Sequence, residues 1–171
     1  LRALIFNHST HTIGMVQPRE AIGGASSLFG VGCAGRITSF SETGDGRYLI
    51  TLTGLLRFRI GNEIESGLAY RKAEVDYGPF VADADVDVTE SGIDRERLFD
   101  AMRLYLDTEN LSTNWEAAGE APTEALVNSL AMGGPFAPNE KQALLEAPTL
   151  ADRADCLIAL MRMGGGDGGE G

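Results

Sequence analysis

The residues of this chain that could carry chemistry are few and widely spaced. His8 and His11 are separated by two residues and could touch one metal ion, but no cysteine or carboxylate lies nearby to complete a ligand set. Cys33 lies among glycines without a neighbouring histidine, which favours a small buried side chain over a nucleophile. We therefore expect two solvated histidines, a packed cysteine and no metal or cofactor.

The charge of the chain limits the partners that it could bind. The 171 residues carry a formal net charge of −11, which argues against nucleic acid and anionic membranes as partners. The run Asp83–Glu90 has the composition of a calcium loop, but its glycine and distal glutamate are at the wrong offsets, so we interpret it as a solvated linker.

Five arginines in the first half of the chain support two hypotheses. They could form a basic face that recognises acidic peptides, or pair with nearby carboxylates such as Glu42, Glu63 and Glu74, which we favour. They are Arg36, Arg47, Arg57, Arg59 and Arg71. An exposed apolar groove is a further candidate, with packing in the core as the alternative for each of its residues: Met15, Tyr48, Leu55, Leu56 and Phe58.

The elements that would position these residues change type along the chain. Alternating apolar residues predict a β-rich subdomain over residues 1–82, although Leu1–Asn7 is typical of the tail of a helix. Thr43–Gly46 predicts a tight hairpin turn flanked by Phe40 and Tyr48. A long bent strand or a bulged pair is expected from Tyr48 to Ile60.

After an acidic linker at residues 83–92, helical periodicity predicts an α-helical subdomain over 93–163 and a disordered glycine-rich tail over 164–171. Asp94 and Thr123 are expected to cap two of its helices. The predicted helices are Asp94–Asp107, Thr123–Met132, Pro138–Ala147 and Thr149–Met163. Two widely separated cysteines and no apolar run of about 20 residues favour the cytoplasm over a disulfide-bonded or membrane-spanning protein.

Several stretches together resemble a known family. They are IGMVQPRE (13–20), VGCAGRITSF (31–40), GRYLITLTGLLRFRI (46–60), YRKAEVDY (70–77), LVNSLAM (126–132) and PFAPNEKQALLEAP (135–148). They resemble the N-terminal, substrate-binding domain of Lon proteases, particularly its stand-alone bacterial form. The family's usual opening strand, with a Phe-Pro-Leu stretch, is absent, so we expect the sequence to begin part-way into the natural protein.

The resemblance implies an α+β fold, in which a twisted, PUA-like β module, a partly closed barrel, precedes a helical bundle. Lon proteases also contain an ATPase and a serine–lysine peptidase, but the chain has no phosphate-binding loop motif. Ser129 and Lys141 are the right residue types for the dyad, yet Ser129 falls inside a predicted helix without a strained turn to present its oxygen. We expect no catalytic residue.

The function that we favour is a non-catalytic module that binds unfolded or tagged polypeptides, as an adaptor for a separate protease. Apolar patches on the β module and the cleft against the helical bundle would form its surface, with the residues Met15, Arg36, Tyr48, Leu55, Leu56 and Phe58. Two alternatives stay open. One is a small-molecule site in a β pocket, by analogy with PUA-like domains, and the other is weak homo-oligomerisation.

Overall fold

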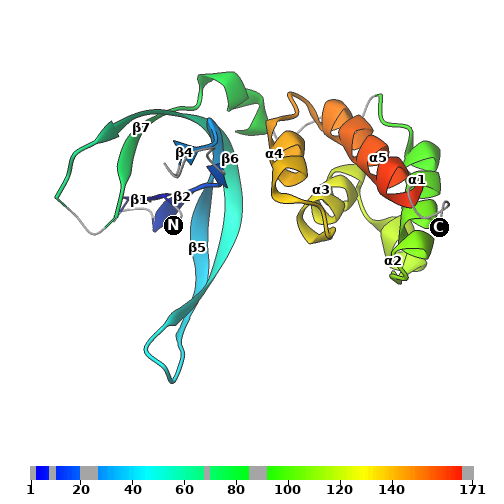
Figure 1. Cartoon of the computed structure of the whole chain (residues 1–171), viewed down its shortest axis with the longest axis horizontal. Coiled ribbons are helices and arrows are strands. Elements are labelled where there is room, and N and C mark those ends of the chain that lie inside the picture. The colour runs from blue at the N-terminus through cyan, green and yellow to red at the C-terminus, as the bar shows by residue number, and fades with distance from the viewer. Residues whose placement is uncertain (1–2, 8–10, 20–26, 68–69, 85–91, 167–171) are drawn as a thin grey trace. The chain divides into compact units, whose positions relative to one another are not determined.

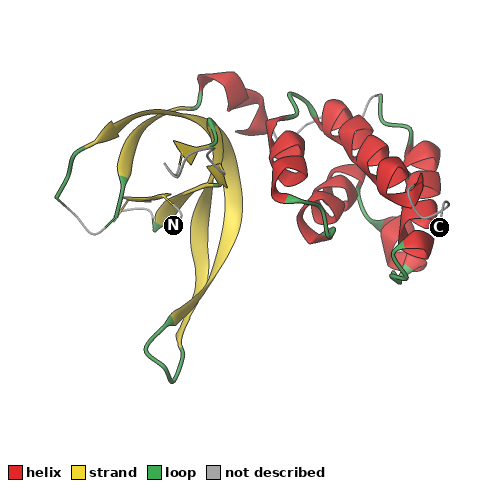
Figure 2. Cartoon of the chain, viewed as in Figure 1, coloured by secondary structure: helices red, strands yellow, loops and turns green. Residues whose placement is uncertain are grey.

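The computed structural model describes residues 3–7, 11–19, 27–67, 70–84 and 92–166. The chain divides into two compact units, Leu1–Val88 and Thr89–Gly171. Figures 1 and 2 show the strands in the first unit and helices α1 to α5 in the second. The predicted α+β class, with an N-terminal sheet followed by helices, is confirmed.

The β unit contains a five-stranded antiparallel sheet in the order β1-β2-β5-β6-β7. Its strands are β1 (Ala3–Asn7), β2 (Thr12–Val16), β5 (Val31–Glu42), β6 (Tyr48–Ile64) and β7 (Lys72–Asp76). The short strands β3 (Pro18–Arg19) and β4 (Ser27–Leu28) pair separately, and a 3-10 helix, η1, spans Gly78–Ala84. No ladder joins β1 to β7 in the described residues, although the two edge strands contact each other, so no closed barrel is seen and the PUA-like, partly closed arrangement stays a prediction.

The prediction that Leu1–Asn7 ends a helix is wrong. Residues 3–7 form β1 and pair with β2 from Ala3 opposite Val16 to Asn7 opposite Thr12. A segment this short cannot satisfy its backbone groups as a helix, whereas a neighbouring strand pairs with them along its whole length. The long strand that the sequence predicts after Tyr48 is confirmed as β6.

The core of the β unit is small and tightly packed. Val16, Ala34 and Phe58 lie at its centre, and partly buried side chains of β4, β6 and β7 pack against them. Gly32 allows β5 to approach β2 closely, because a Cβ atom there would lie 2.6 Å from the Met15 carbonyl oxygen and 2.8 Å from Phe58 Cζ. No larger residue fits this position without displacing backbone.

The helical unit contains α1 (Arg95–Thr108), α2 (Trp115–Glu120), α3 (Thr123–Gly133), α4 (Pro138–Glu146) and α5 (Leu150–Gly166). The four predicted helices are confirmed, and α2 was not predicted. The core is a single cluster, which includes Leu98, Met102, Val127, Leu144, Leu157 and Met161. α5 continues through Gly166, beyond the start of the predicted tail at residue 164, because each added turn still satisfies backbone hydrogen bonds.

Of the two helix caps predicted from the sequence, one is confirmed and one is wrong. Asp94 caps α1, since its side chain accepts a hydrogen bond from the Arg97 amide at 3.0 Å. Thr123 is not a cap, because Pro122 holds that position. The buried Thr123 hydroxyl instead accepts a hydrogen bond from Arg95 at 2.9 Å. A tertiary partner on α1 therefore takes the oxygen that the local pattern assigns to the helix end.

Candidate functional site

The hairpin between β5 and β6 ends in a turn held by hydrogen bonds. The Thr43 amide donates to the Arg47 carbonyl oxygen at 2.8 Å, and the Gly46 amide donates to the Thr43 carbonyl oxygen at 3.0 Å. Gly46 has a φ of +76°, which a glycine adopts without strain. Hydrogen bonds from the Thr43 hydroxyl and the Arg47 amide lower the pKa of Asp45 below its ordinary value. The predicted turn is confirmed, and its side chains fix its shape.

Residues 37–52 form a two-stranded arm, which Figure 1 shows extending beyond the other strands of the β unit. The ladder between β5 and β2 ends at Arg36, and the ladder between β6 and β7 begins at Arg59. Every residue from 38 to 51 is exposed. The arm therefore has two faces and two strand edges that the described residues leave uncovered.

One face of the arm is apolar. Phe40 lies opposite Ile50, and Tyr48 is two positions before Ile50, so all three side chains share this face. The Phe40 and Tyr48 rings stack with centroids 5.0 Å apart. Their exposed fractions are 63% for Phe40, 58% for Tyr48 and 38% for Ile50. We call these three residues the aromatic face.

The opposite face of the arm is mostly polar. Ser41 lies opposite Leu49, and Ser39 lies opposite Thr51. Leu49 is 67% exposed, which makes it the apolar exception on this face. Large apolar side chains seldom remain this exposed as a group in a monomeric protein, and such groups often mark interaction sites. The aromatic face is thus the candidate binding surface of the β unit.

The structure separates the predicted binding residues. Tyr48 lies on the aromatic face, and Leu55 is 41% exposed on the part of β6 that has no β7 partner. Arg36 is exposed, and it lies opposite Thr53 in the β5–β6 ladder. Thr53 is three positions from Ile50, so Arg36 lies on the face opposite the aromatic face. Tyr48 and Leu55 are therefore accessible to a ligand and stay predicted binding residues.

Three other predicted binding residues lie within or against the sheet. Phe58 is 1% exposed at the centre of the core, so the packing alternative describes it and an exposed groove does not. Met15 on β2 and Leu56 on β6 are half-buried. Three of the arm's apolar residues were not predicted from the sequence as binding residues: Phe40, Leu49 and Ile50. Their position beside a predicted tight turn could have indicated that no further strand covers them.

Asp83 has a structural partner and does not lie in a solvated linker. Its carboxylate accepts hydrogen bonds from Arg57 Nε at 2.7 Å and Nη2 at 2.6 Å, and the guanidinium lies 4.7 Å from the Phe80 ring centroid. Arg57 is 5% exposed. The sequence suggests a solvated run from residue 83 because every other residue there is acidic, but a buried cation selects Asp83. Residues 85–91 lie outside the described residues.

Burial or ion pairs account for the other candidate residues. Burial raises the pKa of the Cys33 thiol above its ordinary value, and the charge of Asp83 adds to this effect. Arg71 pairs with Glu63, as predicted, and Arg47 pairs with Asp45. Within the described part of the chain, no group of three or more His, Cys, Asp and Glu side chains is placed to hold a metal ion. His8 falls outside that part.

Ser129 and Lys141 do not contact each other through any hydrogen bond among the described residues. Ser129 is exposed within α3, and the Lys141 ammonium donates to the Met132 carbonyl oxygen at 3.0 Å. No described helix is both long enough and apolar enough to cross a membrane.

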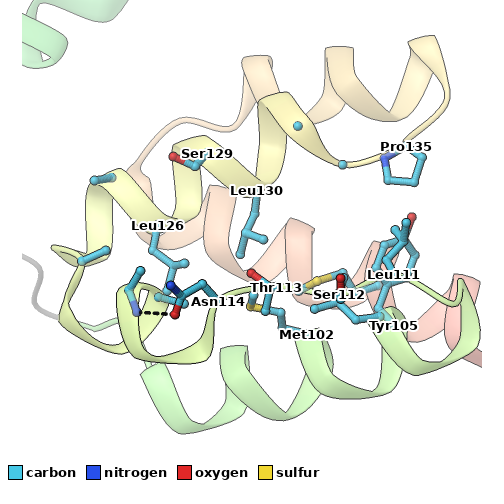
Figure 3. A pocket seen from close by; sticks show the side chains of 18 of the residues that line it. Met102, Tyr105, Leu111, Ser112, Thr113, Asn114, Leu126, Ser129, Leu130 and Pro135 are labelled. Carbon is cyan, nitrogen blue, oxygen red and sulfur yellow. Dashed lines mark hydrogen bonds between the residues drawn. The ribbon is translucent and has the colours of Figure 1, made fainter.

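The helical unit has an apolar pocket of about 490 Å³ between α1, α2 and α3 (Figure 3). Met102 and Tyr105 of α1 and Leu126 and Leu130 of α3 line it, and the segment from Leu111 to Asn114 borders it. This volume suits a small ligand or a bulky side chain. The small-molecule hypothesis places a site in the β module, whereas this pocket lies wholly within the helical unit.

Comparison with known proteins points to one family. The family model of the ATP-dependent protease La (LON) substrate-binding domain matches residues 2–163. No curated protein matches the chain.

Two solved structures share the fold. The N-terminal domain of the Lon protease of Mycobacterium avium complex has a TM-score of 0.56 at 15% identity, covering 94% of this chain and 94% of that chain. The Lon N-terminal domain protein from Xanthomonas campestris has a TM-score of 0.55 at 16% identity, covering 93% of this chain and 94% of that chain. At such identities the likeness concerns the fold alone.

Proposed function

The chain belongs to the family of ATP-dependent protease La (Lon) substrate-binding domains, and from this premise we propose that its β unit binds unfolded polypeptide segments without catalysing a reaction. The observation that supports this proposal is the arm, whose aromatic face is exposed while its turn is held by hydrogen bonds. An ordered surface loses little conformational freedom when it binds a partner. Family membership supports a protein substrate as the ligand, and the exposed arm supports a surface for it.

An unfolded polypeptide matches the chemistry of the arm in two ways. Its backbone N–H and C=O groups are unpaired and can add a strand to an open edge of β5 or β6. Its exposed apolar side chains can cover Phe40, Tyr48 and Ile50, and each such side chain contributes about 1–2 kcal/mol when the remaining exposed area is buried. Neither interaction reads a particular sequence, so broad and weak selectivity is expected.

The proposal is tested by fluorescence anisotropy of a labelled, permanently unfolded protein titrated with the chain, with the folded form of the same protein as the control. Selective binding in the micromolar range, about −8 kcal/mol, is expected for the unfolded form alone. Phe40→Ser combined with Tyr48→Ser should weaken it at least about tenfold, since about 1.4 kcal/mol corresponds to a factor of ten.

The polar face of the arm provides the matched control. Ser39→Ala combined with Ser41→Ala changes the same two strands without touching the aromatic face, and its affinity should equal that of the unaltered chain. Both double variants alter exposed residues, so their circular dichroism spectra should match the unaltered chain. Equal binding by both variants would remove the aromatic face from the proposal.

An adaptor role is a separate proposal, which family membership alone supports. We propose that a separate protease receives the bound polypeptide, and the expected result is faster degradation of the unfolded protein when the chain is added to that protease. Open arm edges also permit two copies to pair with each other. Sedimentation velocity over a range of concentrations detects such pairing. Pairing through the aromatic face would be lost in the variant with Phe40→Ser and Tyr48→Ser, whereas pairing through the strand edges would remain.

A further inference from the structure

The pocket of the helical unit lies in a part of the chain that carries a net negative charge. Residues 89–171 carry six Lys and Arg side chains and fifteen Asp and Glu side chains, a formal charge of −9 out of the chain's −11. The lining is nevertheless apolar, with Met102, Leu126, Leu130 and Met161 among its residues. An apolar cavity within a negative field selects an apolar group attached to a cation.

Two carboxylates concentrate the negative charge at one end of the pocket. Glu109 is the C-cap residue of α1, and its amide donates to the Tyr105 carbonyl oxygen at 2.9 Å. Glu140 lies on α4, and its carboxylate accepts from the amide of Ala137, which follows Phe136. The Phe136 and Tyr105 rings stack 5.6 Å apart. Figure 3 shows Tyr105 at this end, beside Leu111 and Pro135.

The phenol of Tyr105 senses these charges. Burial raises the pKa of Tyr105 above its ordinary value, and the charges of Glu109 and Glu140 raise it further. A field that opposes a negative phenolate favours a positive group at the same place. The Lys141 ammonium donates to the Met132 carbonyl oxygen near the end of α3. A second cation, Arg95, donates to the carbonyl oxygens of Ala118 and Ala121, which line the pocket, but it lies ten positions before Tyr105, or about 15 Å along α1.

Helix ends add to the field. α1 ends at Thr108, just before Leu111, and α3 ends at Gly133, just before Pro135, and both Leu111 and Pro135 line the pocket. The C-terminal end of a helix has a partial negative charge that attracts cations within about one turn. The N-terminus of α2, which has the opposite partial charge, meets the pocket at Asn114, nearer the other end in Figure 3.

We propose that this pocket binds a bulky apolar side chain of a polypeptide segment in which the neighbouring residue is Lys or Arg. The apolar side chain fills the cavity between α1 and α3, and the cation lies near Glu109 and Glu140. This inference rests on the proposed function and adds a class of segment to it, at a site separate from the arm. The chemistry excludes an anionic amphiphile, which the same carboxylates would repel.

The single tryptophan of the chain reports on this site. Trp115 begins α2, directly after the pocket residue Asn114 and two positions before the pocket residue Ala117. Short tryptophan-free peptides with a central phenylalanine flanked by lysines, serines or glutamates are titrated into the full chain while Trp115 fluorescence is recorded. The lysine peptide should give a saturable change, with an affinity at least about tenfold above that of the glutamate peptide at low salt. Salt of about 0.5 M should reduce this difference.

Variants separate the cavity from the charge. Ala125→Phe and Ser129→Phe place a ring over the cavity from two turns of α3, and each should abolish the response. Ala159→Phe makes the same change at an exposed position outside the lining and should bind normally. All three substitutions are at exposed positions, so the helix content measured by circular dichroism should be retained.

The charge is tested at Glu109, which has no helix-capping side-chain bond to lose. Glu109→Gln should weaken binding of the lysine peptide about two- to fivefold, the range for one exposed ion pair, and leave the serine peptide unchanged. Glu96→Gln is the control. Glu96 lies nine positions before Tyr105, and since nine residues make two and a half turns it is on the opposite side of α1.

Each outcome decides one part of the proposal. Equal affinity for the lysine and glutamate peptides overturns the charge selection, and preference for the glutamate peptide assigns the pocket to anionic groups. No saturable change with any peptide overturns the pocket as a peptide site. Binding of the unfolded protein through the arm is measured by anisotropy and depends on Phe40 and Tyr48, so the proposed function fails or survives independently of this result.

Discussion

Asp83→Ala is expected to lower the free energy of unfolding of the β unit by about 3–5 kcal/mol, because it removes the carboxylate that pairs with the buried Arg57 charge. Asp83 accepts three hydrogen bonds from Arg57, from the backbone amide at 3.3 Å, Nε at 2.7 Å and Nη2 at 2.6 Å. At about 1.5–3 kcal/mol each, the three bonds would together contribute about 4.5–9 kcal/mol, which reaches or exceeds the expected cost. The Asp83 side chain is 22% exposed, so water compensates part of the loss.

The assay is urea unfolding followed by two probes. Far-ultraviolet circular dichroism at a wavelength sensitive to strands follows the β unit, while fluorescence of Trp115 follows the helical unit, in which α2 lies. With a slope of about 1 kcal/mol/M for a unit of this size, the strand transition should move by about 3 M or be lost. The Trp115 transition should not move.

A second variant checks the cause. Arg57→Met combined with Asp83→Leu removes both charges together, and replacement of a buried ion pair by apolar residues is often neutral. This double variant should recover most of the stability that Asp83→Ala loses. A loss below about 1 kcal/mol for Asp83→Ala, or a double variant less stable than the single one, would refute the assignment of a buried, partner-dependent charge.

Three further predictions concern stability and thiol chemistry. Gly32→Ala should cost about 2–3 kcal/mol by overpacking, because its Cβ would lie 2.6 Å from the Met15 carbonyl oxygen. Gly30→Ala has nothing within 4 Å and should be tolerated, and equal urea midpoints for the two variants would contradict this. Arg95→Met should destabilise the helical unit by about 2–3 kcal/mol, since its guanidinium donates to three carbonyl oxygens of the segment 118–121 and to one hydroxyl; an unchanged tryptophan transition in urea would contradict it. Burial raises the pKa of Cys33 above its ordinary value of 9.0, so the folded state keeps this proton longer than the unfolded state. Stability should therefore be unaffected below that pH and fall above it, and a Cys33→Ala variant whose stability between pH 8 and about 11 falls as steeply as before would show that another group is responsible.

The sequence predicts the local features of this protein well. The change from alternating to helical periodicity separates the strands from the helices because each period places apolar residues on one face of one kind of element. The turn at Thr43–Gly46 was predictable because its geometry depends on the residues within it. The stretches quoted for the family are similarly local, and they are sufficient to identify the family.

The features that the sequence did not predict depend on residues distant in the chain. β1 becomes a strand only because β2 is available to pair with it. Thr123 accepts a hydrogen bond from Arg95, 28 positions earlier, and Asp83 pairs with Arg57, 26 positions earlier. Such partners decide whether a polar side chain caps a helix, remains in water or neutralises a buried charge.

The candidate site also combines a feature that the sequence shows with a feature that only the tertiary structure decides. The pattern of apolar residues in β5 and β6 is visible in the sequence, but it does not say which residues a neighbouring strand will cover. Tertiary structure decides this, because the ladders to β2 and β7 end before the arm begins. Phe58 is therefore buried and Phe40 exposed, although both are phenylalanines in paired strands of the same sheet, since burial depends on what the rest of the chain packs against each position.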